Sequence, residues 1–351
     1  MKDRTKEVIR DGFGSLVNNA AAIRGAKNGP LWLTIVFFFL SLLLPVLPVF
    51  IAQANTTGSS FLGSYSYGLE RTVTAIALDL KNNRNVELGI SEDHLLTISE
   101  NGSGINYSNY GSTTPFATYE NQSSKQYDLL VYVSNAESSA EKKVINTAIT
   151  ANMYTLETTA KTEEKANAYK PSWMILYKDS FSIVINSNNG TTSITSYTGD
   201  YKTMKATTTG LTDFLKVNDK DGNAVEAKLQ NDAYTAGVLA NFKQVLNKSY
   251  ETAKVRNMWG TSGIYLGIFA GLTIVMGFLM WILTRGKNNP NNYYSPWLTM
   301  KVAARLALAP ALITLVVGFF LTQQVPLIFI MTMGLRVMWT SMKELRPVQQ
   351  Q

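Results

Sequence analysis

The sequence has 351 residues, of which 46% are hydrophobic and 16% charged, and its formal net charge is +7. It contains no cysteine and a single histidine, His94, which excludes disulfides and metal sites built on thiolates or imidazoles. No cofactor is expected. Residues 55–258 hold 19 basic and 21 acidic side chains, whereas the remaining segments hold 13 basic and 4 acidic ones beside apolar stretches. That distribution is typical of loops held against anionic lipid, and it argues against a nucleic-acid-binding protein.

Residues 1–30 form a basic leader. Within it, apolar residues at helical spacing predict a short amphipathic helix on the membrane surface, although a partly ordered leader is an equally good reading. The positive charge places this end in the cytoplasm. The apolar residues are Ile9, Phe13, Leu16, Val17 and Ala20, and the basic ones are Lys2, Arg4, Lys6, Arg10, Arg24 and Lys27.

Residues 31–54 carry no charge over 24 positions, which is long enough for a helix to cross a membrane. A cleaved signal peptide is the alternative, but its apolar core would be too long and would start too far from the N-terminus. We expect Pro45 and Pro48 to kink or loosen the last turns of this helix.

Residues 55–258 form a polar segment that we expect to be an extracellular α+β domain. Runs of β-branched and aromatic residues predict strands at 71–80, 94–99, 128–134, 172–186 and 192–197, and helical patterns cover 136–153 and 230–258. The turn residues Asp221-Gly222 between two apolar runs predict a hairpin.

Three further spans are predicted, and no breaker except Gly260 and Gly263 separates the last external helix from the first of them. Arg336 falls within the fourth span, where snorkelling or helix pairing is favoured over a functional contact. The chain is therefore predicted to be a plasma-membrane protein with four transmembrane helices and both termini in the cytoplasm. The predicted segments are spans at 260–284, 303–322 and 326–342, a cytoplasmic loop at 285–302 and a cytoplasmic tail at 343–351.

Gly263, Gly267 and Gly271 recur at every fourth position of the second span. Three positions without side chains on one helix face allow another helix to approach closely. The pattern predicts helix packing but leaves open whether the partner is another span of this chain or another protein.

The sequence shows no catalytic motif. It lacks a phosphate-binding GxxxxGK[ST] loop, a GxSxG elbow and an SxxK nucleophile, and the predicted spans contain no acidic residue for coupling to an ion. Acidic residues of the outer domain, such as Asp79 and Asp179, are read as solvated rather than as a glycosidase pair. If the domain binds a saccharide, aromatic rings would stack on it, although a structural role is favoured for them. The candidate rings are Tyr65, Tyr67, Tyr107, Tyr110 and Trp173.

The chain resembles the Gram-positive membrane family of unknown function that includes the maltodextrin-utilisation protein MalA. The resemblance lies in the order of segments and in short stretches: FGSLVNNAAAIRG, SWMILYKDSFSIV, TSITSYTGDYKTM and PLIFIMTMGLRVMWTSMKEL. It implies a plasma-membrane protein of a low-GC Gram-positive or wall-less bacterium, in some cases encoded with sugar-uptake systems. The family has no established catalytic residues to carry over.

These observations predict a non-enzymatic membrane accessory or sensor protein. Its outer domain would bind a partner protein or a saccharide, and its spans would pack in the lipid bilayer on transporter subunits or on a second copy. The resemblance associates it with a maltodextrin ABC uptake system. One alternative is a transmembrane subunit of an ABC-type transporter, against which the short loop at 285–297 argues. The other is a cell-wall-acting hydrolase, which would need paired carboxylates.

Overall fold

The chain divides into two compact units, which are described separately. The membrane unit comprises Met1–Asn55 and Arg256–Gln351, and the α+β unit comprises Thr56–Val255. Helix α8 (Asp232–Leu283) contributes residues to both. The computed structural model describes residues 10–61, 67–110, 114–121, 126–161, 171–187, 193–204, 215–285 and 289–345.

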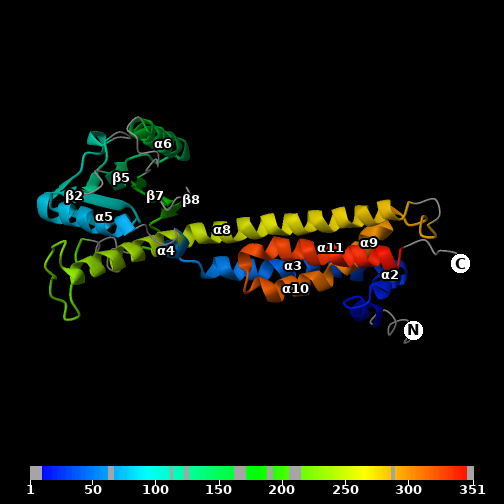
Figure 1. The fold of residues 1–351 in the computed structure, drawn as a ribbon. Helices are drawn as coiled ribbons and strands as arrows, with labels where there is room; N and C mark the ends of the chain where they lie inside the picture. Colours follow the sequence, from blue (N-terminus) through cyan, green and yellow to red (C-terminus); the bar gives the residue numbers. More distant parts are fainter. Residues whose placement is uncertain are drawn as a thin grey trace. The chain divides into compact units, whose positions relative to one another are not determined.

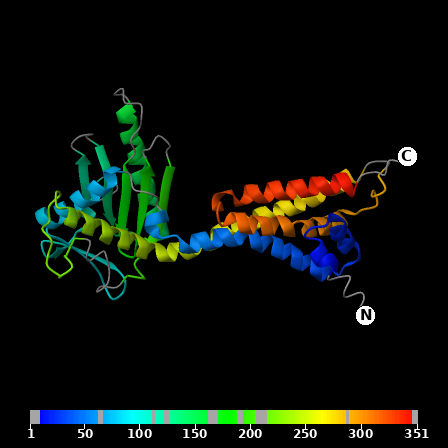
Figure 2. The same ribbon diagram turned by 60° about the horizontal axis from the view of Figure 1, so that its bottom comes forward.

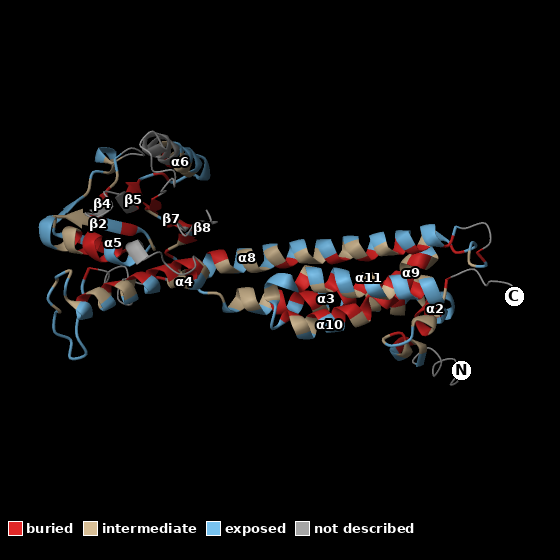
Figure 3. Ribbon diagram, viewed as in Figure 1, coloured by how far each residue is buried: buried red, intermediate tan, exposed pale blue. Residues whose placement is uncertain are grey.

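The membrane unit contains helices that are long and apolar enough to cross a membrane, as the sequence predicts. These are α3 (Leu31–Asn55), α8, the pair α9 (Pro296–Leu306) and α10 (Leu308–Gly318), and α11 (Val325–Lys343) with the short turn η3 (Thr322–Gln324) before it. In Figures 1 and 2, α3, α10 and α11 run side by side. Figure 3 shows buried residues where these helices face one another and exposed residues on their outer faces. Many of the exposed residues are large and apolar, such as Phe39, Val316 and Leu335, as expected for helices surrounded by lipid.

The core of the membrane unit comes from every one of these helices. Phe269 and Met280 of α8 pack with Val46 of α3 and with Phe329 and Met333 of α11. The rings of Phe269 and Phe329 lie 4.8 Å apart. All residues of this core belong to the membrane unit.

The third span differs from the prediction at both ends. It begins at Pro296 rather than at residue 303, because Ser295 caps the helix by accepting a hydrogen bond from Leu298 N at 3.2 Å and proline suits the first helical turn. It ends at Gly318 and is interrupted at Ala307. Pro310 lies in the turn that follows and has no N–H to donate to the carbonyl four residues before it.

The leader is helical in two pieces instead of one. Residues 10–14 are helical, a turn follows, and α2 (Asn19–Asn28) begins where the Asn18 side chain accepts hydrogen bonds from Ala20 N and Ala21 N. A side-chain cap of this kind fixes a helix start and so divides the predicted single helix. Phe13 and Val17, on the predicted apolar face, are 74% and 90% exposed.

The α+β unit is built on a five-stranded sheet in the order β4-β5-β6-β7-β8. Neighbouring strands are antiparallel except β5 and β6, which are parallel and joined by a connection that contains α6 (Ser139–Lys161). Figure 2 shows this sheet, with α6 on one side of it. The strands are β4 (Ala117–Asn121), β5 (Gln126–Ser134), β6 (Ser172–Tyr177), β7 (Ser180–Ser187) and β8 (Ser193–Asp200).

Both faces of this sheet are buried at β5 and β6, where apolar residues follow one another without alternation. Leu129 and Val131 of β5 belong to the core that α5 and α8 cover, whereas Leu130 and Tyr132 pack beneath α6 with Ile149. Continuous apolar runs are typical of strands covered on both faces. The predicted strand at 172–186 is in fact two strands, since the chain turns at Lys178-Asp179.

The prediction of a strand at residues 71–80 is wrong. This stretch belongs to α5 (Tyr67–Leu78) and a following π-helical turn (Asp79–Asn83). Val73, Ile76, Ala77 and Leu80 are spaced for one helix face and all are buried in the larger core, so burial overrides the strand preference of the Thr and Val residues.

A smaller sheet and several turns complete the α+β unit. The sheet consists of β1 (Val86–Ile90), β2 (Leu96–Glu100) and β3 (Ser103–Gly104), and the short helices are α4 (Gly58–Phe61) and η2 (Tyr107–Asn109). Asn101 and Gly102 have φ values of 52° and 78°, as the tight turn between β2 and β3 requires. The predicted hairpin at Asp221-Gly222 is present as a bridge between Asn218 and Ala224.

Candidate functional site

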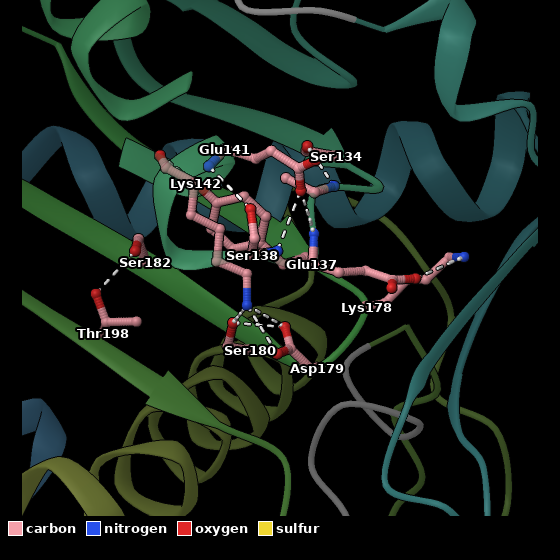
Figure 4. Close-up of polar contacts among 12 residues, drawn as sticks. Ser134, Glu137, Ser138, Glu141, Lys142, Lys178, Asp179, Ser180, Ser182 and Thr198 are labelled. Carbon is pink, nitrogen blue, oxygen red and sulfur yellow. Dashed lines mark hydrogen bonds and ion pairs between the residues drawn. The ribbon is translucent and has the colours of Figure 1, made fainter. Parts of the chain in front are cut away.

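The most concentrated polar cluster of the α+β unit joins the start of α6 to the turn between β6 and β7 (Figure 4). Lys142 Nζ lies 2.5 Å and 2.7 Å from the two carboxylate oxygens of Asp179 and 3.0 Å from Ser180 Oγ. Ser180 Oγ donates to Asp179 Oδ1 at 2.8 Å. Ser138 and Glu141 cap the helix reciprocally, because Ser138 Oγ accepts from Glu141 N and the Glu141 carboxylate accepts from Ser138 N.

This cluster has the residues of a serine–lysine dyad but not its chemistry. A lysine that acts as a base needs a free amine beside the serine, whereas Lys142 here forms an ion pair with Asp179. Burial acts to raise the pKa of Asp179, but hydrogen bonds from Lys142 and Ser180 outweigh it and lower that pKa overall. Ser180 is 7% exposed, and its hydroxyl already donates a hydrogen bond to Asp179. The cluster therefore fixes the helix on the hairpin.

A second polar cluster surrounds Arg84. Its Nε lies 2.7 Å from Glu100 Oε1, its Nη2 donates to Tyr110 Oη at 2.9 Å, and its Nη1 donates to the backbone oxygen of Phe116. The guanidinium also lies over the Phe116 ring, 4.4 Å from its centroid. The hydrogen bond from Arg84 lowers the pKa of Glu100. Tyr110 is half-buried, and its hydroxyl accepts a hydrogen bond from Arg84 of the same unit.

The aromatic residues named for saccharide stacking do not form one described surface. Trp173 is 7% exposed and belongs to the core beneath α6. Tyr107 and Tyr110 are half-buried against the larger core on the other face of the sheet. Tyr65 and the side chain of Tyr67 lie outside the described residues. Among the described residues, no three histidine or acidic side chains are placed to hold a metal ion.

The glycine face of α8, defined as Gly263, Gly267 and Gly271, is not covered by any other described part of the chain. A Cβ atom added at any of the three would meet no other atom within 4 Å, apart from the helix's own backbone. Close packing of α8 instead occurs at Gly277, where an added Cβ would lie 3.0 Å from Met300 Cα of α9. Within the described part of the chain, these three glycines therefore do not pack on another span.

Arg336 donates hydrogen bonds to the leader and to α9 within the membrane unit. Its Nε donates to Asn19 Oδ1 at 3.1 Å, its Nη1 donates to Leu306 O at 2.8 Å, and its Nη2 donates to Ser15 O. All three acceptors are neutral, and two of them belong to the leader. Arg336 therefore holds the leader against α9 and α11.

Arg305 of α9 is a second arginine inside the membrane unit, and unlike the half-buried Arg336 it is fully buried. It is 1% exposed, and its Nε donates to Thr34 Oγ1 of α3 at 3.1 Å. Its guanidinium lies against Gly25 of α2 and against Gly29, which follows α2, and a Cβ at Gly29 would lie 2.8 Å from Nη2. The spacing of those two glycines was the available signal, because only glycine leaves room for the guanidinium there.

Comparison with known proteins adds no family to this description. The sequence matches no protein-family model, and no curated protein and no solved structure matches it.

Proposed function

We propose that this protein is a non-enzymatic accessory or sensor subunit of a membrane complex. In this proposal the α+β unit lies outside the cell and binds a partner protein or a saccharide, while α8 packs on a helix of a transporter subunit or of a second copy. The observation that carries the proposal is the uncovered glycine face of α8.

A glycine face is suited to a protein partner more than to lipid. Helix association within a bilayer depends on close packing, and small residues allow two backbones to approach. The glycine face is flanked by exposed apolar residues, with Ile264 at 65% and Ile268 at 39% exposure. Since α8 also supplies Phe242 and Val245 to the core of the α+β unit, a partner on its membrane part would contact an element that both units share.

The polar clusters support a non-enzymatic role. Lys142 and Arg84 are each bonded to a carboxylate and to further groups of the same unit, so neither cluster offers a free base or nucleophile. The family resemblance, with its link to sugar uptake, is the basis for proposing a transporter as the partner. Sugar binding itself has no support from a described aromatic platform.

The proposed topology follows from charge. Basic residues gather in the leader, in the loop after α8 and after α11, which favours the cytoplasm for these segments and the outside for the α+β unit.

A pair of substitutions on one helix tests the proposal. Gly267→Leu places a large side chain on the glycine face, whereas Ile268→Leu changes the adjacent position at almost constant volume. Neither change is expected to disturb the fold. A Cβ at Gly267 would meet no described atom within 4 Å apart from its chain neighbours and the helix's own backbone, and Ile268 is partly exposed. The measurement is the mass of the complex purified in mild detergent after cross-linking in the membrane.

We expect the wild-type chain and Ile268→Leu to form a complex larger than one chain, and Gly267→Leu to lose most of it. Mass spectrometry of the complex then identifies the partner as a second copy or another membrane protein. Equal complexes from the two variants, or a single uncomplexed chain from the wild type, would contradict the proposal.

A further inference from the structure

A groove of about 250 Å³ lies on the membrane unit between α3, α8 and α9. Its walls are apolar and include Ile35 and Phe38 of α3, Ile274 of α8 and Met300 of α9. Along α3 the lining runs from Leu31 to Phe38, which is about 10 Å of helix. Since Ile35 and Ile274 are 46% and 43% exposed on helices that cross the membrane, the groove opens toward lipid.

A basic and an aromatic side chain lie at the end of the groove formed by the first turns of α9. Lys301 Nζ lies 5.8 Å from the centroid of the Trp297 ring, and both side chains line the groove. Tryptophan and lysine near a helix end are typical of the boundary between hydrocarbon and lipid headgroups, where lysine extends its ammonium toward the phosphates.

Lys301 has no acidic partner among the described residues. The described part of the membrane unit contains two carboxylates, Asp11 and Glu344. Asp11 pairs with Arg24 at 3.4 Å, while Arg336 donates to backbone oxygens and an amide. The interaction that the structure gives for the Lys301 ammonium is with the ring of Trp297. The Lys301 ammonium therefore has no carboxylate paired with it in the described part of the membrane unit, which leaves it available to an anionic group.

We propose that this groove binds an anionic phospholipid, with one acyl chain along Phe38 and Ile274 and the phosphate on Lys301. A basic side chain at the end of an apolar groove between spans matches such a lipid in both charge and shape. A soluble anion would use Lys301 but not the groove, and a zwitterionic lipid would use the groove but gain less from Lys301. The proposal does not depend on the proposed function.

The test uses the full-length protein in detergent. Native mass spectrometry measures how much phosphatidylglycerol or phosphatidylcholine remains bound, and thermal unfolding measures the stabilisation that each lipid gives. We expect the wild type to retain phosphatidylglycerol preferentially. Lys301→Gln should reduce that retention about fivefold, which corresponds to about 1 kcal/mol for a basic residue near an anionic lipid. Lys343→Gln, which removes an exposed cation at the end of α11, is the control and should change nothing.

Ile35→Trp provides a second variant that keeps the charge and fills the groove from an exposed position. We expect it to lower retention of both lipids. Equal retention of the two lipids by the wild type, equal effects of Lys301→Gln and Lys343→Gln, or displacement of phosphatidylglycerol by millimolar inorganic phosphate would each overturn the proposal.

Discussion

Arg336 donates a hydrogen bond of 2.8 Å to the backbone oxygen of Leu306, the carbonyl that Pro310 leaves without its helical partner. In a continuous helix the N–H of residue 310 would bond to residue 306, and proline has none. An unsatisfied carbonyl inside a membrane costs free energy, so an arginine from α11 replaces the missing donor. The same guanidinium binds Ser15 and Asn19, which couples the break between α9 and α10 to the leader.

We predict that Arg336→Lys destabilises the membrane unit although it keeps the charge. One ammonium group cannot reach three acceptors on separate elements, whereas the planar guanidinium can. Loss of one hydrogen bond from a charged donor costs about 1.5–3 kcal/mol. The measurement is the thermal unfolding midpoint of the full-length protein in detergent, with Arg24→Lys at a half-exposed position as the control.

A second substitution, Pro310→Ala, tests whether Arg336 replaces the N–H that is missing at Pro310. Alanine restores an N–H that can bond to Leu306 O, so Arg336→Lys should cost less in the Pro310→Ala background than in the wild type. A double-mutant cycle measures that difference. Identical costs in both backgrounds would show that Arg336 does not serve the carbonyl that Pro310 leaves free.

The spans could be predicted from the sequence because length and lack of charge are local properties. Leu31–Asn55 has no charged residue. Apart from its prolines, the helix makes its backbone hydrogen bonds within the segment, so the segment alone is enough to predict a membrane span. The prediction of a strand at residues 71–80 was wrong for the opposite reason. Their β-branched residues favour a strand locally, and only packing against distant strands β4 and β5 makes them a helix.

The contacts of Arg305 and Arg336 could not be predicted, because they join segments far apart in the chain. Arg336 bonds to Ser15, and Arg305 to Thr34, across 321 and 271 positions. A single sequence shows that Arg336 is a charged residue within a predicted span, but it does not show which atoms accept its hydrogen bonds. Gly25 and Gly29 are read as ordinary leader residues until the guanidinium of Arg305 is seen against them. The uncovered state of Gly263, Gly267 and Gly271 likewise required the positions of the other helices.

The predicted topology can be tested by thiol labelling, since the chain has no cysteine of its own. Ser103→Cys, on the exposed turn of the α+β unit, should react with an impermeant maleimide in intact cells. Asn292→Cys, exposed in the loop between α8 and α9, should react only after the cells are permeabilised. Asn289 is unsuitable because it is 5% exposed and bonded to Leu345 O. Labelling of Asn292→Cys from outside would contradict the proposed orientation.

The ion pair between Lys142 and Asp179 should give the α+β unit a pH-dependent stability. The pKa of Asp179 is lowered on folding, so its contribution is complete above the unfolded value of about 3.9 and is lost as pH falls through the folded pKa. Asp179→Asn should lower stability by no more than about 1 kcal/mol at pH 7, because the carboxylate is 48% exposed. The difference from the wild type should shrink below about pH 4. Glu92→Gln, at an exposed acid, is the control.

Sugar binding, if it occurs, should not involve Trp173. This side chain is the only tryptophan of residues 56–255 and lies in the core beneath α6. Maltodextrins added to the α+β unit should therefore leave its fluorescence unchanged, since a stacked sugar alters the emission of an exposed indole. Calorimetry with the same sugars measures binding at other positions. Quenching of Trp173 by maltodextrin would contradict its placement in the core.

The last prediction is that residues 56–255 fold without the membrane unit. Both cores of the α+β unit are built entirely from its own residues, including those of α8 up to Ala253. Folding should give blue-shifted, poorly quenched emission from Trp173 and a cooperative unfolding transition. Ile149→Ala, at a fully buried position of α6, should destabilise the fragment by about 2–5 kcal/mol, whereas Val144→Ala, 67% exposed on the same helix, should have little effect. A fragment with exposed Trp173 emission and no cooperative transition would show that the α+β unit requires the membrane unit, and equal effects of the two substitutions would contradict the packing of α6 on the sheet.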